Sequence, residues 1–98
     1  MSTIGPRILC IEKDLALVET RCSVLKRAGY DASWAALAEA EILLRSQAFD
    51  LIILSATLNQ EEKRRIITAA GSKTKILALS ELTMPLELLS EVSEQLRE

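Results

Sequence analysis

Two acidic residues and a serine directly follow apolar runs of the sequence. Glu12 and Asp14 come after residues 7–11, and Ser55 comes after residues 51–54. A pair of carboxylates can transfer protons or hold a hard cation, and a serine hydroxyl can act as a nucleophile. These three residues are therefore the first candidates for chemistry in this chain.

The residues around them favour structural roles. Lys13 separates the two acids and Asp14 is placed to cap a helix, so we expect charge balance rather than a catalytic pair. Ser55 has no GxSxG motif around it and the chain has no histidine to activate it, so we expect its hydroxyl to bond nearby backbone groups. A second interpretation is a small-anion site in which Lys13, Ser55 and Ser80 converge near helix amino termini.

Composition indicates one globular domain over residues 1–98, with residues 1–5 as a flexible lead-in. The chain has 98 residues and 49% hydrophobic content, with a net charge of −2 and dispersed basic residues, which disfavours nucleic-acid binding. No apolar run reaches the length of a membrane span and no signal segment opens the chain, so we expect a cytoplasmic protein that binds neither membrane nor nucleic acid. We expect no cofactor, and the lack of histidine excludes imidazole chemistry and histidine phosphorylation.

The two cysteines, Cys10 and Cys22, lie inside predicted regular elements and lack CxxC spacing. This pattern is typical of buried, reduced thiols rather than of a disulfide or a metal site.

Alternating strand and helix patterns predict an α/β fold. The run at residues 51–54 has no polar alternation, which is typical of a central parallel strand covered on both faces. The predicted strands are residues 7–11, 30–35, 49–55 and 75–79. The predicted helices cover residues 15–28, which Gly29 ends, 37–47, 61–70 after a turn at Asn59-Gln60, and 84 onward, with Pro85 in the first turn. Ile66, Ile67 and Ala70 form the apolar side of the third helix. Right-handed crossovers then imply one parallel sheet with helices on both faces.

The ordered set of segments RILCIEKD, LKRAGYDA, FDLIILSATL and KILALSE resembles the receiver domain of bacterial two-component response regulators. The resemblance covers most of the chain from about residue 7 to residue 82. It implies a flavodoxin-like fold with four strands in the order 2-1-3-4.

The resemblance also implies that much of the family's chemistry is missing. Receivers hold Mg²⁺ with two acidic residues after the first strand, where this chain has Glu12 and Lys13. The phosphoryl acceptor, an aspartate in the family, corresponds to Ser55, which lacks the carboxylate needed for an acyl phosphate. The readout hydroxyl is retained as Ser80, whereas the family's lysine–proline pair corresponds to Met84-Pro85. We therefore expect a pseudo-receiver that is not an enzyme and has no metal site.

The chain is also short for this family. Only residues 81–83 separate Ser80 from Met84, too few for the family's fourth helix and fifth strand. The fourth strand would then be a sheet edge with an apolar sequence, formed by Ile76, Leu77, Ala78 and Leu79. A second copy or a partner strand would cover this edge; alternatively, the last helix or the turn at Leu82 folds over it.

The leading hypothesis is a phosphorylation-independent protein-interaction module in bacterial two-component-type signalling. It would contact a signalling protein, or a second copy as a homodimer, through the fourth strand or the last helix. The competing hypothesis is a residual phosphoryl acceptor or anion-binding receiver that uses Glu12, Asp14 and Ser55. A fragment of a larger receiver protein is a third interpretation.

Overall fold

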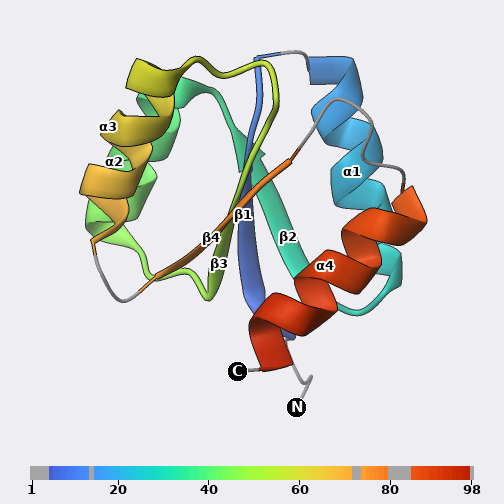
Figure 1. Ribbon diagram of the computed structural model, residues 1–98. Coiled ribbons are helices and arrows are strands. Elements are labelled where there is room, and N and C mark those ends of the chain that lie inside the picture. Colours follow the sequence, from blue (N-terminus) through green and yellow to red (C-terminus); the bar gives the residue numbers. More distant parts are fainter. Residues whose placement is uncertain (1–4, 14, 72–73, 80–84, 98) are drawn as a thin grey trace.

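The computed structural model describes residues 5–13, 15–71, 74–79 and 85–97. Strands and helices alternate along the chain, as the sequence predicts (Figure 1). The strands are β1 (Arg7–Ile11), β2 (Asp31–Ala35), β3 (Leu51–Leu54) and β4 (Lys75–Ala78), and the helices are α1 (Leu15–Arg27), α2 (Leu37–Ser46), α3 (Gln60–Ala70) and α4 (Pro85–Arg97). The predicted lead-in falls almost entirely outside the described residues.

The four strands form one parallel sheet in the order β2-β1-β3-β4. Ile8 of β1 pairs with Ala32 of β2 on one side and with Leu51 of β3 on the other. The predicted strand order is therefore confirmed. Its consequence is that β1 and β3 are the interior strands, and their carboxyl ends lie side by side.

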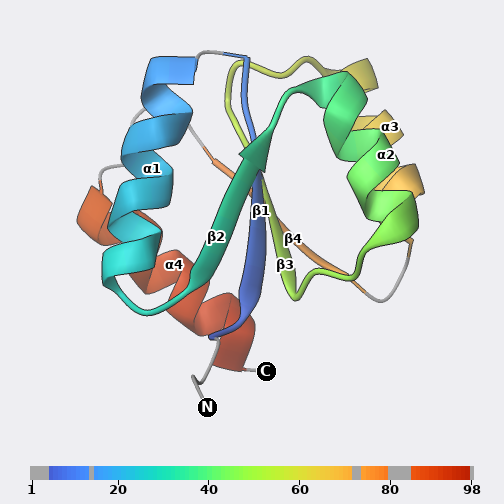
Figure 2. The same cartoon turned by 180° about the vertical axis from the view of Figure 1, so that it is seen from behind.

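The helices cover both faces of the sheet. Helices α1 and α4 lie on one face and α2 and α3 lie on the other, as Figures 1 and 2 show from opposite sides. This arrangement explains why β1 and β3 lack polar alternation, because both of their faces meet helices.

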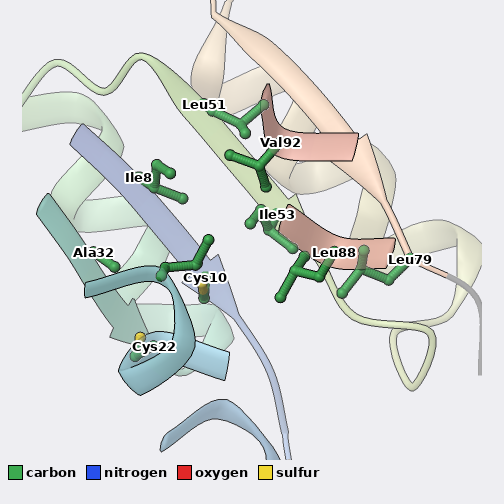
Figure 3. Packing of buried hydrophobic residues seen from close by; sticks show 10 residues of the cluster. Ile8, Cys10, Cys22, Ala32, Leu51, Ile53, Leu79, Leu88 and Val92 are labelled. Carbon is green, nitrogen blue, oxygen red and sulfur yellow. The ribbon is translucent and has the colours of Figure 1, made fainter. Parts of the chain in front are cut away.

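The sheet divides the hydrophobic core into two clusters. Successive side chains of a strand point to opposite faces, so Ile53 enters the cluster under α1 and α4 whereas Ile52 enters the cluster under α2 and α3. Figure 3 shows Leu88 and Val92 of α4 near β3 in the first cluster. The buried members of the first cluster are Ile8, Cys10, Cys22, Leu25, Ala32, Leu51, Ile53, Leu79, Leu88 and Val92.

Local signals set the helix ends. Asn59 caps α3 by accepting a hydrogen bond from the Glu62 backbone N–H at 2.8 Å, and the Glu62 side chain returns a bond to the Asn59 N–H. Gly29, two residues after the end of α1, has a φ of 100°, a conformation that favours glycine, so its predicted role as a helix stop is confirmed.

Two sequence expectations need correction. The strand predicted over residues 49–55 spans only Leu51–Leu54. The Asp50 and Ser55 backbone N–H groups still donate to the Arg7 and Ile11 carbonyls of β1, at 2.8 Å and 3.2 Å, so the prediction and the structure differ only in where the strand ends. Ile67 was expected to face inward with Ile66, but it is 49% exposed. Adjacent residues on a helix are about 100° apart, so a narrow buried stripe cannot include both.

None of the helices in the described part of the chain is long and apolar enough to cross a membrane.

Candidate functional site

The candidate site lies where β1 and β3 end. Glu12 follows β1 and Ser55 follows β3, and the Ser55 backbone N–H donates to the Ile11 carbonyl at 3.2 Å. Adjacent parallel strands present their carboxyl ends at the same sheet edge. The predicted proximity of Glu12 and Ser55 is therefore present in the structure.

Glu12 is the centre of this site. Its side chain is 1% exposed, and its two carboxylate oxygens accept hydrogen bonds from three side chains and one backbone group. Arg21 Nη1 lies 2.8 Å from Oε2, which also accepts the Ser55 hydroxyl. The Thr57 hydroxyl and the Lys13 backbone N–H donate to Oε1, the latter at 2.8 Å. These donors offset the cost of removing a carboxylate from water.

Ser55 is equally buried, at 1% exposure. Its hydroxyl donates to Glu12 and accepts the Thr57 backbone N–H at 3.2 Å, while Arg21 Nη1 lies 3.4 Å away. The expected bond to the local backbone is present. The Glu12 carboxylate is an additional partner that the sequence did not reveal, because it comes from a strand 43 residues away.

Arg21 and Thr57 complete the cluster, and both were missed in the sequence. Arg21 is the third basic residue of the chain, on α1, and its side chain is 18% exposed in the ion pair with Glu12. The place of Arg21 on the helix that follows β1 is the one signal in the sequence that could have indicated its pairing with Glu12. Thr57 lies two residues after Ser55, a spacing at which hydroxyls bond the local turn.

The Lys13 side chain forms no ion pair with Glu12, although it was expected to balance the charge of the two acids beside it. Its ammonium group pairs with Glu62 of α3 at 2.8 Å and its side chain is 50% exposed. The pKa of Glu62 is lowered mainly by the Lys13 hydrogen bond and then by the Asn59 backbone N–H. The cation that contacts Glu12 is thus Arg21, and Lys13 contributes only its backbone N–H to the cluster.

Other predicted site residues lie outside the described residues. These are Asp14, Ser80 and Met84. Pro85 is the first residue of α4, in agreement with its predicted place in the first turn. Of the three side chains expected to converge, only that of Ser55 lies in the buried cluster; the Lys13 side chain pairs with Glu62, and Ser80 lies outside the described residues.

The predicted interaction edge is only partly available at the surface. Leu79 is 4% exposed and belongs to the first core cluster, while Leu77 packs against that cluster. Ile76 packs against the second cluster, and Ala78 is exposed. Leu79 is thus a core residue. What β4 offers is its backbone and the side chains on the α3 face.

The two cysteines are free, buried and close together in the first core cluster, as Figure 3 shows. A hydrogen bond between the thiols lowers the pKa of Cys22 and raises that of Cys10, where burial adds to the increase. The predicted buried, reduced state is therefore the state in the structure. Among the described residues, no group of three or more cysteine and acidic side chains could hold a metal ion.

Comparison with known proteins relates this geometry to a family. No family model matches the chain. The swarming motility regulation protein RssB of Serratia marcescens is 38% identical in an alignment of 77 residues that covers 74% of this chain and 35% of that protein. The chain therefore spans about a third of the length of this relative.

Solved structures define the fold. A response regulator receiver domain protein from Methanospirillum hungatei superposes with a TM-score of 0.70 at 16% identity, covering 97% of this chain and 95% of the other. A signal receiver domain from Pseudomonas fluorescens gives 0.68 at 19% identity, with coverage of 99% and 90%. A receiver domain from Methylobacillus flagellatus gives 0.65 at 13% identity, with coverage of 95% and 99%. The resemblance predicted from the sequence is confirmed: the chain has the fold of response regulator receiver domains, in a four-stranded form.

Proposed function

We propose that this chain is a pseudo-receiver that acts in bacterial two-component-type signalling by binding a protein, without phosphorylation. The receiver fold supports a signalling role, as does its similarity to a protein whose name assigns it to swarming motility regulation. Such a module would work in the cytoplasm, without a cofactor and without catalysis.

The observation that carries this proposal is the ion pair between Glu12 and Arg21. In receivers, the acidic residues after the first strand hold a divalent cation. Here the Arg21 guanidinium lies 2.8 Å from Glu12 Oε2 and supplies positive charge from within the chain. Mg²⁺ requires oxygen ligands in near-octahedral geometry, and a bound guanidinium excludes it from the same oxygen.

The residue at the acceptor position supports the same conclusion. A receiver aspartate forms an acyl phosphate through its carboxylate, whereas Ser55 has a hydroxyl. That hydroxyl is 1% exposed and donates to Glu12, so a phosphoryl donor would need to displace an existing hydrogen bond in a closed site. The site is therefore suited to holding β1, β3 and α1 together.

A residual acceptor or anion site, using Glu12, Asp14 and Ser55, is the alternative. One observation favours it: Arg21 Nη1 lies 3.4 Å from Ser55 Oγ, where it could contact an anion. The Glu12 carboxylate opposes it, because this negative charge contacts the same hydroxyl and repels an anion.

Treatment with acetyl phosphate and Mg²⁺, followed by intact-mass analysis, tests the proposal. We expect no phosphoryl adduct on the wild-type chain and no change in melting temperature with Mg²⁺ alone. The Ser55→Ala variant is the matched control, because it identifies any adduct that requires the hydroxyl. An adduct on the wild type that is absent from Ser55→Ala would contradict the proposal and favour the alternative.

A further inference from the structure

The free side of β4 and the adjoining face of α3 form a shallow groove. It has a volume of about 270 Å³ and its lining includes Leu54, Ile76, Ala78 and Ile67 together with Lys63 and Arg64. Ile67 is 49% exposed and Ala78 is also exposed, so this lining is open to a partner. Among the described strands, β4 pairs only with β3, which leaves its other side as an edge of the sheet.

Backbone groups on this edge point outward at known positions. The Leu79 N–H donates to the Leu54 carbonyl at 2.9 Å, on the β3 side. Residues of a parallel strand alternate in the side to which they direct their N–H and C=O groups. The groups of Ile76 and Ala78 therefore face away from β3, next to the groove that their side chains line.

The charge at the groove is of one sign. Three basic residues follow one another on α3, and the third, Arg65, pairs with Glu41 of α2 at 2.5 Å. Lys63 and Arg64, which line the groove, form no ion pair with any described residue. The groove thus combines outward backbone groups, an apolar floor and two basic side chains that form no ion pair with a described residue.

We propose that this groove binds an extended acidic segment of a partner protein, which pairs with β4 as a fifth strand. Side chains at alternate positions of the segment share the face toward α3. On that face, apolar side chains would contact Ile67, Ile76 and Ala78, and acidic side chains would contact Lys63 and Arg64. This inference rests on the proposed function in one respect, that the chain acts by binding a protein. It adds the chemistry of that partner and the place where it binds.

A pair of peptides tests the proposal on the full chain. Each has about eight residues, an ordinary strand length, with serine at every second position. The positions between the serines share one face, and they carry two valines and two glutamates in one peptide and two valines and two lysines in the other. We expect the glutamate peptide to bind at least about tenfold more tightly, by fluorescence anisotropy, because it complements the two cations. We also expect it to shift the NMR signals of the Ile76 and Ala78 amides.

Two variants separate strand pairing from charge. Ala78→Pro removes an outward N–H without removing a bond to β3, and we expect it to reduce affinity about tenfold. Ala78→Ser keeps that N–H and should bind like the wild type. The double variant Lys63→Glu, Arg64→Glu should reverse the preference between the two peptides, and circular dichroism confirms that each variant is folded.

Three outcomes overturn the proposal: equal affinity for both peptides, amide shifts away from β4 and α3, or no binding. A fourth is self-association in light scattering that Ala78→Pro abolishes, because the occupant is then a second copy. Peptide binding that requires prior treatment with acetyl phosphate and Mg²⁺ leaves the groove proposal intact and contradicts the phosphorylation-independent function. The two proposals therefore fail separately.

Discussion

Arg21 Nη1 lies 2.8 Å from Glu12 Oε2, on a carboxylate that is 1% exposed. A residue of α1 thus provides the counter-charge for a residue at the end of β1. The pair ties a helix to the sheet at the edge where receivers carry out their chemistry. Its removal should therefore affect stability before it affects anything else.

Arg21→Ala should lower the free energy of unfolding by about 3 kcal/mol, because it leaves the buried Glu12 carboxylate without its ion-pair partner. Urea denaturation at neutral pH measures this change. Arg27→Ala, at an exposed position of the same helix, is the control and should change stability by less than about 0.5 kcal/mol. A similarly small effect of Arg21→Ala would show that the ion pair does not stabilise the fold.

An aspartate at position 55 should not by itself create a metal site. Ser55→Asp places a second carboxylate beside Glu12, but Arg21 still occupies Oε2, so we expect a less stable protein whose melting temperature changes little with Mg²⁺. The double variant Ser55→Asp, Arg21→Ser removes that cation and should be stabilised by Mg²⁺. Calorimetry with Ca²⁺ and Mg²⁺ in parallel checks the result. If Mg²⁺ raised the melting temperature of the wild type as much as that of the double variant, Arg21 would not be what prevents metal binding.

Glu62 should contribute to the acid sensitivity of the fold. Its folded-state pKa is lowered, first by the Lys13 hydrogen bond, so its contribution is fully present above the unfolded-state pKa of about 4.5 and is lost as pH falls through the lower folded-state value. Glu62→Gln keeps a capping side chain at the third position of α3 but cannot titrate. Denaturation curves from neutral pH to pH 3 should therefore show a smaller acid loss for Glu62→Gln than for the wild type. Parallel losses in both proteins would assign the acid sensitivity to other carboxylates.

The cysteine pair should react unequally. The Cys10 thiol donates to Cys22, which lowers the pKa of Cys22 and raises that of Cys10, so alkylation at mildly alkaline pH should modify Cys22 first. Both reactions should be slow in the native state, because the side chains are 2% and 4% exposed. Cys10→Ala removes the donor, so the rate profile of Cys22 should move to higher pH. Mass spectrometry of iodoacetamide-treated protein measures both rates, and faster modification of Cys10 would reverse this assignment of donor and acceptor.

Much of the fold could be predicted from local patterns. The uninterrupted run at Leu51–Leu54 indicated a strand covered on both faces, and it is an interior strand of the sheet. Gly29 and the Asn59 turn marked helix boundaries because their conformations are set by neighbouring residues. Helix geometry allows only one of Ile66 and Ile67 at the centre of a narrow buried stripe, but which of the two is buried depends on the segments packed against α3, which local patterns do not give.

The sequence predicted where the site lies but only some of the residues that form it. Glu12 and Ser55 meet because parallel strands end at one edge, a rule that topology alone supplies. Arg21 contacts Glu12 because of the orientation of α1 on the sheet, whereas the Lys13 side chain pairs with Glu62 instead of with Glu12. Each of these two ion pairs joins separate segments of the chain, and local sequence patterns do not show which segments will meet.

The division of the core by the sheet has a consequence for how this chain can change. Ile52 and Ile53 are neighbours in sequence, yet each packs with side chains that the other does not contact. A change of volume at Ile53 can be compensated from α1 or α4, and a change at Ile52 from α2 or α3. Compensating substitutions are therefore expected within each face and not across the sheet, so that the two faces can drift independently while the strand backbone that positions Glu12 and Ser55 stays in place.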